Sequence, residues 1–383
     1  MTVVDLAIVG DFRFPGGTSS CIASEIAALH GGGYQVLLIQ IDSSILPSNR
    51  PINPLIGAAI ERGEARMLAG AQGSIHARLA ILHHPQSFDD IPEQFVRLRA
   101  PVRILVVHHA PADGAGIPYY DPRALHRNVE REFGEGVLWA PISPFIRDEL
   151  SKAAPEITLH DEDWANFLDP REWRCPRERP VAEHPVIGRH SRPDLSKWPA
   201  TASAMLAAYP DDPDILVRLL GVSDALRTII DPFPDNWQTF RFNAMAPSAF
   251  LKTIDFFVYY HHPNLREAFG RTVLEALASG AVAVLPRHFE PMFGEAAIYR
   301  DLEEVVPTVR ALHADWQCYR EQSQRGVTFV TERLGPAAFL QRIERLIGPR
   351  PRLQAIRGGQ AEAAVPQQQD VFDVLMLVDA AID

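Results

Sequence analysis

Short β-branched runs alternate with amphipathic stretches along most of this chain, and this alternation limits the possible folds more than any other feature. Helical spacing is clearest after the first run, where Ile22, Ile26 and Leu29 share one face. The β-branched runs fall into two series, at residues 3–9, 35–41, 77–82, 102–107 and 137–140, and at residues 185–188, 215–220, 239–242, 256–260 and 281–285. Strands that alternate with helices form parallel sheets covered by helices. The sequence therefore predicts an α/β protein with two doubly wound, Rossmann-like domains.

A stretch rich in Arg and Pro, residues 170–185, separates the two series and has the composition of a linker. We predict an N-terminal domain over residues 1–175 and a C-terminal domain over residues 183–348, with helices near residues 337–347. A tail follows at residues 349–383. Its low-complexity part, 358–369, is expected to be flexible, and the apolar residues 371–378 are either a last docked element or the start of a further domain. The four linker arginines are expected to form a solvated face: Arg171, Arg174, Arg177 and Arg179.

Composition excludes several classes of protein. The chain has 383 residues and a formal charge of −11, which gives no support to a nucleic-acid partner. The three cysteines, Cys21, Cys175 and Cys318, fit neither a zinc motif nor a disulfide framework, and this agrees with a reducing compartment. We see no signal peptide and no apolar run of about 18 residues. We therefore expect a cytoplasmic protein.

Two carboxylates stand eight residues apart, Glu267 before Gly270 and Glu275 after it. On one continuous helix they would point in different directions, because eight residues advance two turns plus about 80°. A bend at Gly270 removes this conflict, with Thr272 as a candidate cap of a helix that ends before Gly280. The N–H groups of such a helix start favour an anion, and carboxylates accept hydrogen bonds from sugar hydroxyls. The pattern suits a sugar nucleotide.

This stretch resembles the E-x7-E signature of retaining GT-B glycosyltransferases of the family-4 type. The resemblance extends over residues 1–348 and implies the GT-B fold, in which two Rossmann-like domains face each other across a cleft. It also implies roles for individual residues. Glu267 would contact the donor sugar and Glu275 the nucleotide ribose, and the rest of the nucleotide site would include Phe269, Gly270, Arg271 and Thr272.

A second motif follows the first strand of the second series, where Gly188-Arg189 and the later Lys197 resemble the G-R-x-S segment and the lysine of the same family. There, the arginine and the lysine hold the donor diphosphate. A guanidinium fork and a flexible ammonium can together neutralise a diphosphate leaving group. The spacing from Arg189 to Lys197 is longer than the common family form, so Arg192 is the substitute for Lys197.

Gly16, Gly17 and Thr18 follow the first strand at the entrance to a helix, and they resemble the family's glycine loop, where acceptor and donor phosphate meet. The tripeptide lacks the spacing of a dinucleotide fold and the ending of a P-loop, so neither an NAD enzyme nor an ATPase is favoured. A turn that needs positive φ explains the glycines equally well.

Histidines occur in pairs at the ends of predicted strands. The family often has one histidine at the position of His108 and His109, where it touches the donor sugar, and either of the two could fill that role. Similar pairs stand at residues 83–84 and 261–262. Adjacent strand residues point to opposite faces, so each pair can place only one ring in a site. No carboxylate stands at recognised ligand spacing, and we expect no metal site.

The resulting hypothesis is a glycosyltransferase that moves a sugar from a nucleotide-diphosphate donor to a hydroxyl acceptor with retention, without cofactor or metal. A glycan or lipid-linked glycan acceptor, surface polysaccharide synthesis and a peripheral contact with the inner membrane face are expectations by analogy. Two alternatives remain. One is a GT-B sugar-nucleotide epimerase, and the other is a non-catalytic scaffold or binding protein with the same fold.

Overall fold

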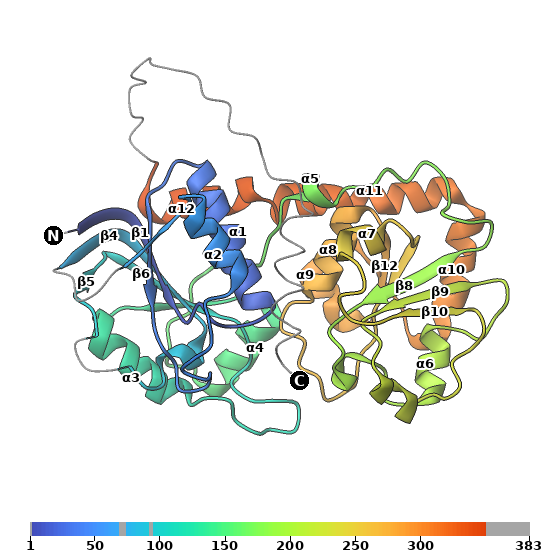
Figure 1. Cartoon of the computed structure of the whole chain (residues 1–383), viewed down its shortest axis with the longest axis horizontal. Coiled ribbons are helices and arrows are strands. Elements are labelled where there is room, and N and C mark those ends of the chain that lie inside the picture. The colour runs from blue at the N-terminus through green and yellow to red at the C-terminus, as the bar shows by residue number, and fades with distance from the viewer. Residues whose placement is uncertain (1, 69–73, 92–94, 350–383) are drawn as a thin grey trace, which may run out of the picture. The chain divides into compact units, whose positions relative to one another are not determined.

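The computed structural model describes residues 2–68, 74–91 and 95–349, and it contains two parallel β-sheets flanked by helices (Figure 1). Within these residues the first sheet has seven strands in the order β3-β2-β1-β4-β6-β7, with β5 beside β4. Its strands are β1 (Thr2–Gly10), β2 (Val36–Gln40), β3 (Arg66–Met67), β4 (Ile75–His83), β5 (Leu98–Arg99), β6 (Val102–Val107) and β7 (Leu138–Pro141). The helices of this part of the chain are α1 (Gly17–Gly31), α2 (Pro54–Glu61), η1 (Pro85–Phe88), α3 (Pro122–Phe133), α4 (Pro144–Ala153) and α5 (Pro170–Trp173).

The second sheet has six strands among the described residues, in the order β10-β9-β8-β11-β12-β13. These strands are β8 (Val186–His190), β9 (Leu216–Leu220), β10 (Trp237–Phe240), β11 (Phe256–Val258), β12 (Val282–Leu285) and β13 (Ile298–Tyr299). The α-helices that follow in the chain are α6 (Ala202–Ala208), α7 (Pro247–Leu251), α8 (Arg271–Ser279), α9 (Glu290–Phe293), α10 (Val305–Ala314), α11 (Trp316–Arg333) and α12 (Pro336–Ile347). The 3₁₀ turns are η2 (Leu195–Lys197), η3 (Asp224–Thr228), η4 (Arg287–Phe289), η5 (Gly294–Ala296) and η6 (Leu302–Glu304).

Both predicted strand series are confirmed, and the strand order explains their composition. Every pairing that carries the cores is parallel, and the central strands are buried on both faces, so they read as continuous apolar runs. In β1, for example, Leu6 pairs with both Val36 of β2 and Leu79 of β4. The sequence missed β3, β5 and β13 because each has two residues, and it placed β10 two residues too late.

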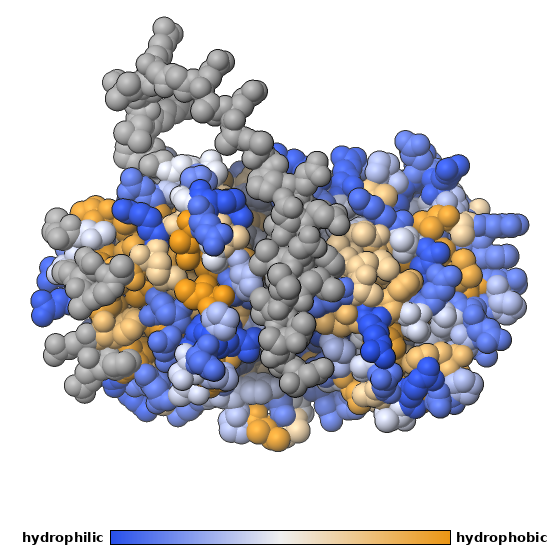
Figure 2. Space-filling view, viewed as in Figure 1, coloured by the Kyte–Doolittle hydropathy of each residue, from blue (hydrophilic) through white to orange (hydrophobic). Residues whose placement is uncertain are grey.

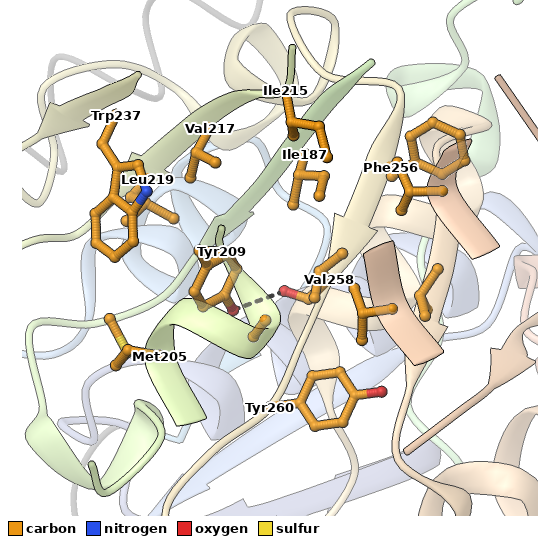
Figure 3. Close-up of a cluster of buried hydrophobic side chains, with 14 of the residues drawn as sticks. Ile187, Met205, Tyr209, Ile215, Val217, Leu219, Trp237, Phe256, Val258 and Tyr260 are labelled. Carbon is orange, nitrogen blue, oxygen red and sulfur yellow. Dashed lines mark hydrogen bonds between the residues drawn. The ribbon is translucent and has the colours of Figure 1, made fainter. Parts of the chain in front are cut away.

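The core of the second sheet is a cluster of apolar side chains (Figure 3). Ile187 of β8, Val217 of β9 and Val258 of β11 belong to this cluster, together with aromatic residues such as Tyr209, which directly follows α6. Tyr209 is fully buried, and its hydroxyl donates to the backbone oxygen of Val258 at 2.9 Å, drawn as the dashed line in Figure 3. The polar tip of this large side chain is therefore satisfied inside the core, at the end of the strand that leads to the candidate site.

The chain divides into two compact units. Of the described residues, one unit comprises those up to 106, 125–138 and 339–349, and the other comprises residues 107–124 and 139–338. The predicted boundaries at residues 175 and 183 stay a prediction, and the predicted tail lies outside the described residues apart from residue 349. Helix α12 confirms the helix expected near residues 337–347, and Figure 1 shows it beside α1. Leu340 of α12 lies so close to Gly32 that a Cβ there would be 2.9 Å from its Cδ2 atom.

The arginine-rich segment differs from its prediction at one position. Arg171, Arg174 and Arg179 are exposed, as expected. Arg177 is buried and donates to the backbone oxygens of Ile254 at 2.6 Å and Leu251 at 2.8 Å. A buried guanidinium needs acceptors, and backbone carbonyls at the ends of α7 and before β11 supply them. Through Arg177 the segment is thus hydrogen-bonded to the chain between the end of α7 and the start of β11, and it is not fully solvated.

Hydrophilic and apolar residues are interspersed on the face shown in Figure 2. None of the helices in the described part of the chain combines the length and apolar character that a membrane span requires.

Candidate functional site

The bend predicted between the two glutamates exists and lies at Gly270. This residue is the N-cap of α8 in the left-handed conformation, with φ of 81° and ψ of 53°, and its carbonyl accepts from the N–H groups of Val273 and Leu274. Thr272 was expected to be the cap and is not, because the helix begins at Arg271. Gly280 ends the helix with φ of 81°, as predicted. A side chain at Gly270 would also meet Phe289, whose Cε1 atom lies 3.0 Å from an ideal Cβ.

Glu275 lies on α8 and is almost wholly buried. Arg271, one turn earlier, donates from Nε to Glu275 Oε1 at 3.0 Å, and His190 Nε2 lies 3.5 Å from Oε2. Burial raises the pKa of Glu275, and the Arg271 guanidinium opposes this rise only in part. Burial, reinforced by the positive charge of Arg189, lowers the pKa of His190 to about 3. The imidazole beside Glu275 is therefore neutral at physiological pH.

Glu267 lies in the loop before α8, with its side chain 13% exposed. Two donors meet at the same oxygen: Lys197 Nζ and the Tyr259 hydroxyl each lie 2.6 Å from Glu267 Oε2. Burial would raise the pKa of Glu267, but the ammonium of Lys197 and the two hydrogen bonds outweigh it and leave the pKa below its usual value. The structure thus brings together Glu267 and Lys197, which are 70 residues apart in sequence.

Arg189 was expected to hold the donor diphosphate, and that role stays a prediction, while the structure places its guanidinium between two aromatic rings. Its side chain is 0% exposed, and its guanidinium carbon lies 4.3 Å from the Trp198 ring centroid and 4.5 Å from that of Tyr259. Nη1 donates to the Tyr260 backbone oxygen at 2.9 Å. Among the described residues Nε and Nη2 have no hydrogen-bond acceptor, so the ring faces stabilise the charge instead. In this conformation Arg189 packs on the ring of Tyr259, whose hydroxyl bonds to Glu267.

Gly188 is also an interior residue. It is buried in β8, and a Cβ there would lie 2.5 Å from Ile254 Cγ2 and 2.9 Å from the Arg218 backbone oxygen. Close packing of the sheet explains this glycine, and ligand contact is not needed to explain it.

A pocket of 580 Å³ adjoins Glu267 and lies within the second compact unit. One wall is Phe145 at the start of α4, above which lies the Arg266 guanidinium, 5.7 Å from the ring centroid. Phe269 and Phe289 form another part of the lining, next to α8. The pocket therefore combines apolar walls with two carboxylates, Glu267 and Asp148, and a few polar groups among apolar walls are the usual character of a small-molecule site.

Two histidines of this pocket form a pair that the sequence did not reveal. His261 Nδ1 lies 2.9 Å from the His262 backbone oxygen, and His261 Nε2 lies 3.2 Å from His288 Nε2. A carbonyl only accepts, so His261 carries its proton on Nδ1, and the His288 Nε2–H group donates to His261. Burial lowers the pKa of His261, and burial together with His261 lowers that of His288 to about 4. Both rings are neutral at pH 7.

The glycine loop of the first compact unit lies where the sequence placed it. Gly16 has φ of 74° and precedes α1, which begins at Gly17 and continues through Thr18. Only a glycine adopts such a φ without strain, so the turn accounts for Gly16, and a ligand contact of Gly16, Gly17 or Thr18 stays a prediction. The preceding residues are held by the buried Asp11. This carboxylate binds Arg13 at 2.7 Å and Ser43 Oγ at 2.6 Å. Burial alone would raise its pKa, yet these bonds lower it to about 2.

His108 and His109 follow β6, as predicted. His108 is 8% exposed. His109 packs edge-on against Tyr119 and Tyr120, each at 5.3 Å between ring centroids, and its Nδ1 atom lies 2.9 Å from the Ala110 backbone oxygen. Burial lowers the pKa of His109, opposed by that hydrogen bond. The geometry gives the His109 ring structural surroundings, and a contact with a sugar stays a prediction for either histidine.

The other histidine pair has a structural role in the first compact unit. His83 ends β4, and its Nε2 atom lies 3.0 Å from Glu25 Oε2 of α1, with both side chains 1% exposed. His84 stacks on Phe14 at 4.1 Å. Across the described ranges no three His, Cys, Asp or Glu side chains are grouped as a metal site would require.

Comparison with known proteins adds the fold class. No protein-family model matches the chain, and no curated protein matches its sequence. The solved structure of Anabaena HepE in complex with UDP is similar, with a TM-score of 0.62, 13% identity, and coverage of 90% of this chain and 99% of that chain. TarM, from S. aureus, has a TM-score of 0.62 at 10% identity, with 90% and 98% coverage. WaaG, a glycosyltransferase involved in lipopolysaccharide biosynthesis, has a TM-score of 0.52 at 11% identity, with 90% and 100% coverage.

These structures define the class. The chain has the GT-B glycosyltransferase fold, with two parallel-sheet α/β domains, as the sequence predicted. Identities of 10–13% establish a likeness in fold, and activity is a separate inference.

Proposed function

We propose that this chain is a retaining glycosyltransferase that moves a sugar from a nucleoside-diphosphate sugar to a hydroxyl acceptor. The observation that carries the proposal is the pair Glu267 and Glu275 on either side of the Gly270 turn, each fixed by a cation, in a GT-B fold. Of the two, Glu267 lines the pocket. A carboxylate on each side of an anion-binding helix start suits a sugar and a ribose joined by a diphosphate.

The proposed chemistry is stabilisation of the leaving group. The first N–H groups of α8 have no acceptor within the helix and present positive charge to a diphosphate. Lys197 carries three N–H donors, and one of them holds Glu267, so the others can reach phosphate oxygens. Arg189 contributes from behind, through the ring of Tyr259. A departing phosphate oxygen would accept the proton of the acceptor hydroxyl, so the proposed reaction needs no divalent metal.

Donor and setting follow by analogy. HepE was solved with UDP and with UDP-glucose, so uridine donors come first in a screen. The role of WaaG in lipopolysaccharide biosynthesis supports a setting in surface polysaccharide or glycoconjugate synthesis, with a glycan acceptor and a peripheral membrane contact.

The first experiment is a thermal-shift screen of the whole protein against UDP-, GDP-, ADP- and dTDP-sugars, with magnesium or with EDTA. A ligand that binds only the folded state raises the melting temperature. We expect one base to raise it equally with and without chelator, and Glu275→Gln to abolish the rise. Glu303→Gln is the matched control, because Glu303 is an exposed glutamate of η6 in the same compact unit. No rise with any of the four bases would contradict the proposal.

Product analysis then separates the reactions. Transfer from the bound donor to an acceptor panel should yield a product with the donor's anomeric configuration, read from the anomeric coupling constant in NMR. An inverted product would refute retention. Conversion of the donor sugar to its epimer without an acceptor would instead identify an epimerase.

A further inference from the structure

We propose that Tyr259 is a positioning residue that fixes Glu267, so that one carboxylate oxygen is saturated and the other is presented to the ligand. The inference rests on the proposed function for its consequence, but its geometric part concerns these two side chains alone. Tyr259 belongs to neither sequence motif and stands eight residues before Glu267.

The first step is the placement of the tyrosine ring. Tyr259 directly follows β11, and its backbone N–H donates to the Val284 oxygen of β12 at 3.2 Å. The side chain is 1% exposed and stacks on Phe257 at 6.0 Å between centroids. The Arg189 guanidinium lies over the same ring. Strand, ring and cation together fix the direction of the hydroxyl.

The second step is the bond that this hydroxyl makes. It donates to Glu267 Oε2 at 2.6 Å and closes the loop between residues 259 and 267 from side chain to side chain. Burial and the nearby Glu267 charge raise the pKa of Tyr259 well above its ordinary value, so it keeps the donated proton at any working pH. The bond is therefore present whenever Glu267 is ionised.

The third step is the division of the carboxylate. Both donors, Tyr259 and Lys197, bond to Oε2, and within the described residues no group donates to Oε1. Glu267 lines the pocket, so Oε1 is the oxygen left for a ligand. Without the tyrosine, the carboxylate would depend on a lysine whose flexible stem comes from a different element, η2.

The consequence concerns Lys197. If Lys197 were the only residue bonded to Glu267, its hydrogen bond to that carboxylate would break when the ammonium turned toward a diphosphate. Because Tyr259 holds the same oxygen, Lys197 can move to the leaving group while Glu267 stays in place. The tyrosine thus separates sugar positioning from phosphate neutralisation.

The test measures Glu267 directly and needs no activity. Protein labelled with ¹³C at glutamate carboxyls is titrated by NMR, and Glu267→Gln identifies the resonance. The groups that face Glu267 and act on its titration are Lys197 of η2, Tyr259 after β11, His261 of the same loop and His288 of η4. Tyr259→Phe changes one of them and keeps the ring.

We expect Tyr259→Phe to move the Glu267 midpoint to higher pH by at least about 0.5, because a hydrogen bond to the charged form is lost. Tyr299→Phe is the matched control, since the Tyr299 hydroxyl donates to the Gly294 backbone oxygen at 2.8 Å. In this control variant the Glu267 midpoint should equal that of the wild type. An unchanged midpoint in Tyr259→Phe would overturn the proposal.

A second measurement covers the case in which Tyr259→Phe does not fold. With ¹³Cζ-labelled tyrosine, Glu267→Gln should move the Tyr259 resonance and leave that of Tyr299 in place. If no tyrosine resonance responds, the bond does not exist in solution. For a donor found in the thermal-shift screen, Tyr259→Phe should shift the acid side of the pH profile of kcat/KM to higher pH. Absence of any donor would refute the proposed function while leaving the NMR result intact.

Discussion

The guanidinium carbon of Arg189 lies 4.3 Å from the ring centroid of Trp198, inside the second compact unit and away from solvent. In the sequence motif, Arg189 and Lys197 share one role, but in the structure they have different surroundings. Arg189 supports Tyr259 from within, and Lys197 is the cation bonded directly to Glu267. The two cations should therefore fail in different ways when they are replaced.

Arg189→Gln should destabilise the protein by about 2–4 kcal/mol, because it removes a buried cation packed between two rings. Lys197→Gln should cost less stability but remove more of the melting-temperature rise caused by a nucleotide sugar. Thermal unfolding with and without ligand measures both effects. An Arg189→Gln protein that melts like the wild type yet binds no donor would show that Arg189 reaches the ligand.

Lys197 and Glu267 should be strongly coupled. Their side chains are 15% and 13% exposed, so each single replacement leaves a mostly buried charge without its partner. In a double-mutant cycle of Lys197→Met and Glu267→Gln, we expect an interaction free energy of about 1–3 kcal/mol. Denaturant unfolding of the four proteins measures it, and additive effects would mean that the pair contributes nothing in solution.

Gly270→Ala should be more damaging than Gly63→Ala. Both glycines have positive φ, 81° and 73°, but only at Gly270 would a Cβ meet neighbours, namely Phe289 at 3.0 Å and Val273 at 3.4 Å. Strain costs about 1 kcal/mol at either site, and crowding adds to it at Gly270 alone. Melting temperatures and nucleotide-sugar shifts of the two variants give the comparison. Equal losses would mean that the helix start tolerates a side chain.

His190 should make the fold sensitive to acid. Its pKa is about 3 in the folded protein and about 6.5 when unfolded, so the unfolded state binds the proton first as pH falls. Stability is then fully present above pH 6.5 and declines between 6.5 and 3, by roughly 1–2 kcal/mol from pH 6.5 to 5. His190→Gln should flatten the melting temperature over this interval, while the exposed control His184→Gln should not. Parallel curves for all three proteins would exclude His190 as the source.

The fold could be predicted because two signals are visible in the sequence. One is the hydrophobic spacing of the helices, and the other is the apolar composition of buried parallel strands. Ile22, Ile26 and Leu29 are all fully buried, as their spacing indicated, and the glycine at residue 280 ends its helix. Two-residue strands such as β13 carry too few residues for any period to show. Local signals thus sufficed wherever an element was long enough.

The site was harder to predict because its contacts are distant in sequence. The motif located Glu267 and Glu275 but could not show that Tyr259 bonds the first or that His190 lies beside the second. Nor could it distinguish a guanidinium that faces a ligand from one enclosed by Trp198. Burial of a charged side chain depends on which aromatic rings the fold brings to it, and no local pattern records that.

Helix α12 has a consequence for how the protein is made. Its residues Phe339 and Ile343 are buried, Arg78 of β4 donates to the Ile347 backbone oxygen, and from residue 339 the helix belongs to the compact unit that opens the chain. A ribosome delivers this helix only after the whole of the other unit has emerged. The first unit therefore cannot complete itself during synthesis. In a nascent chain stalled before residue 336, the apolar surface on which α12 packs should stay exposed to chaperones and proteases until this helix is synthesised.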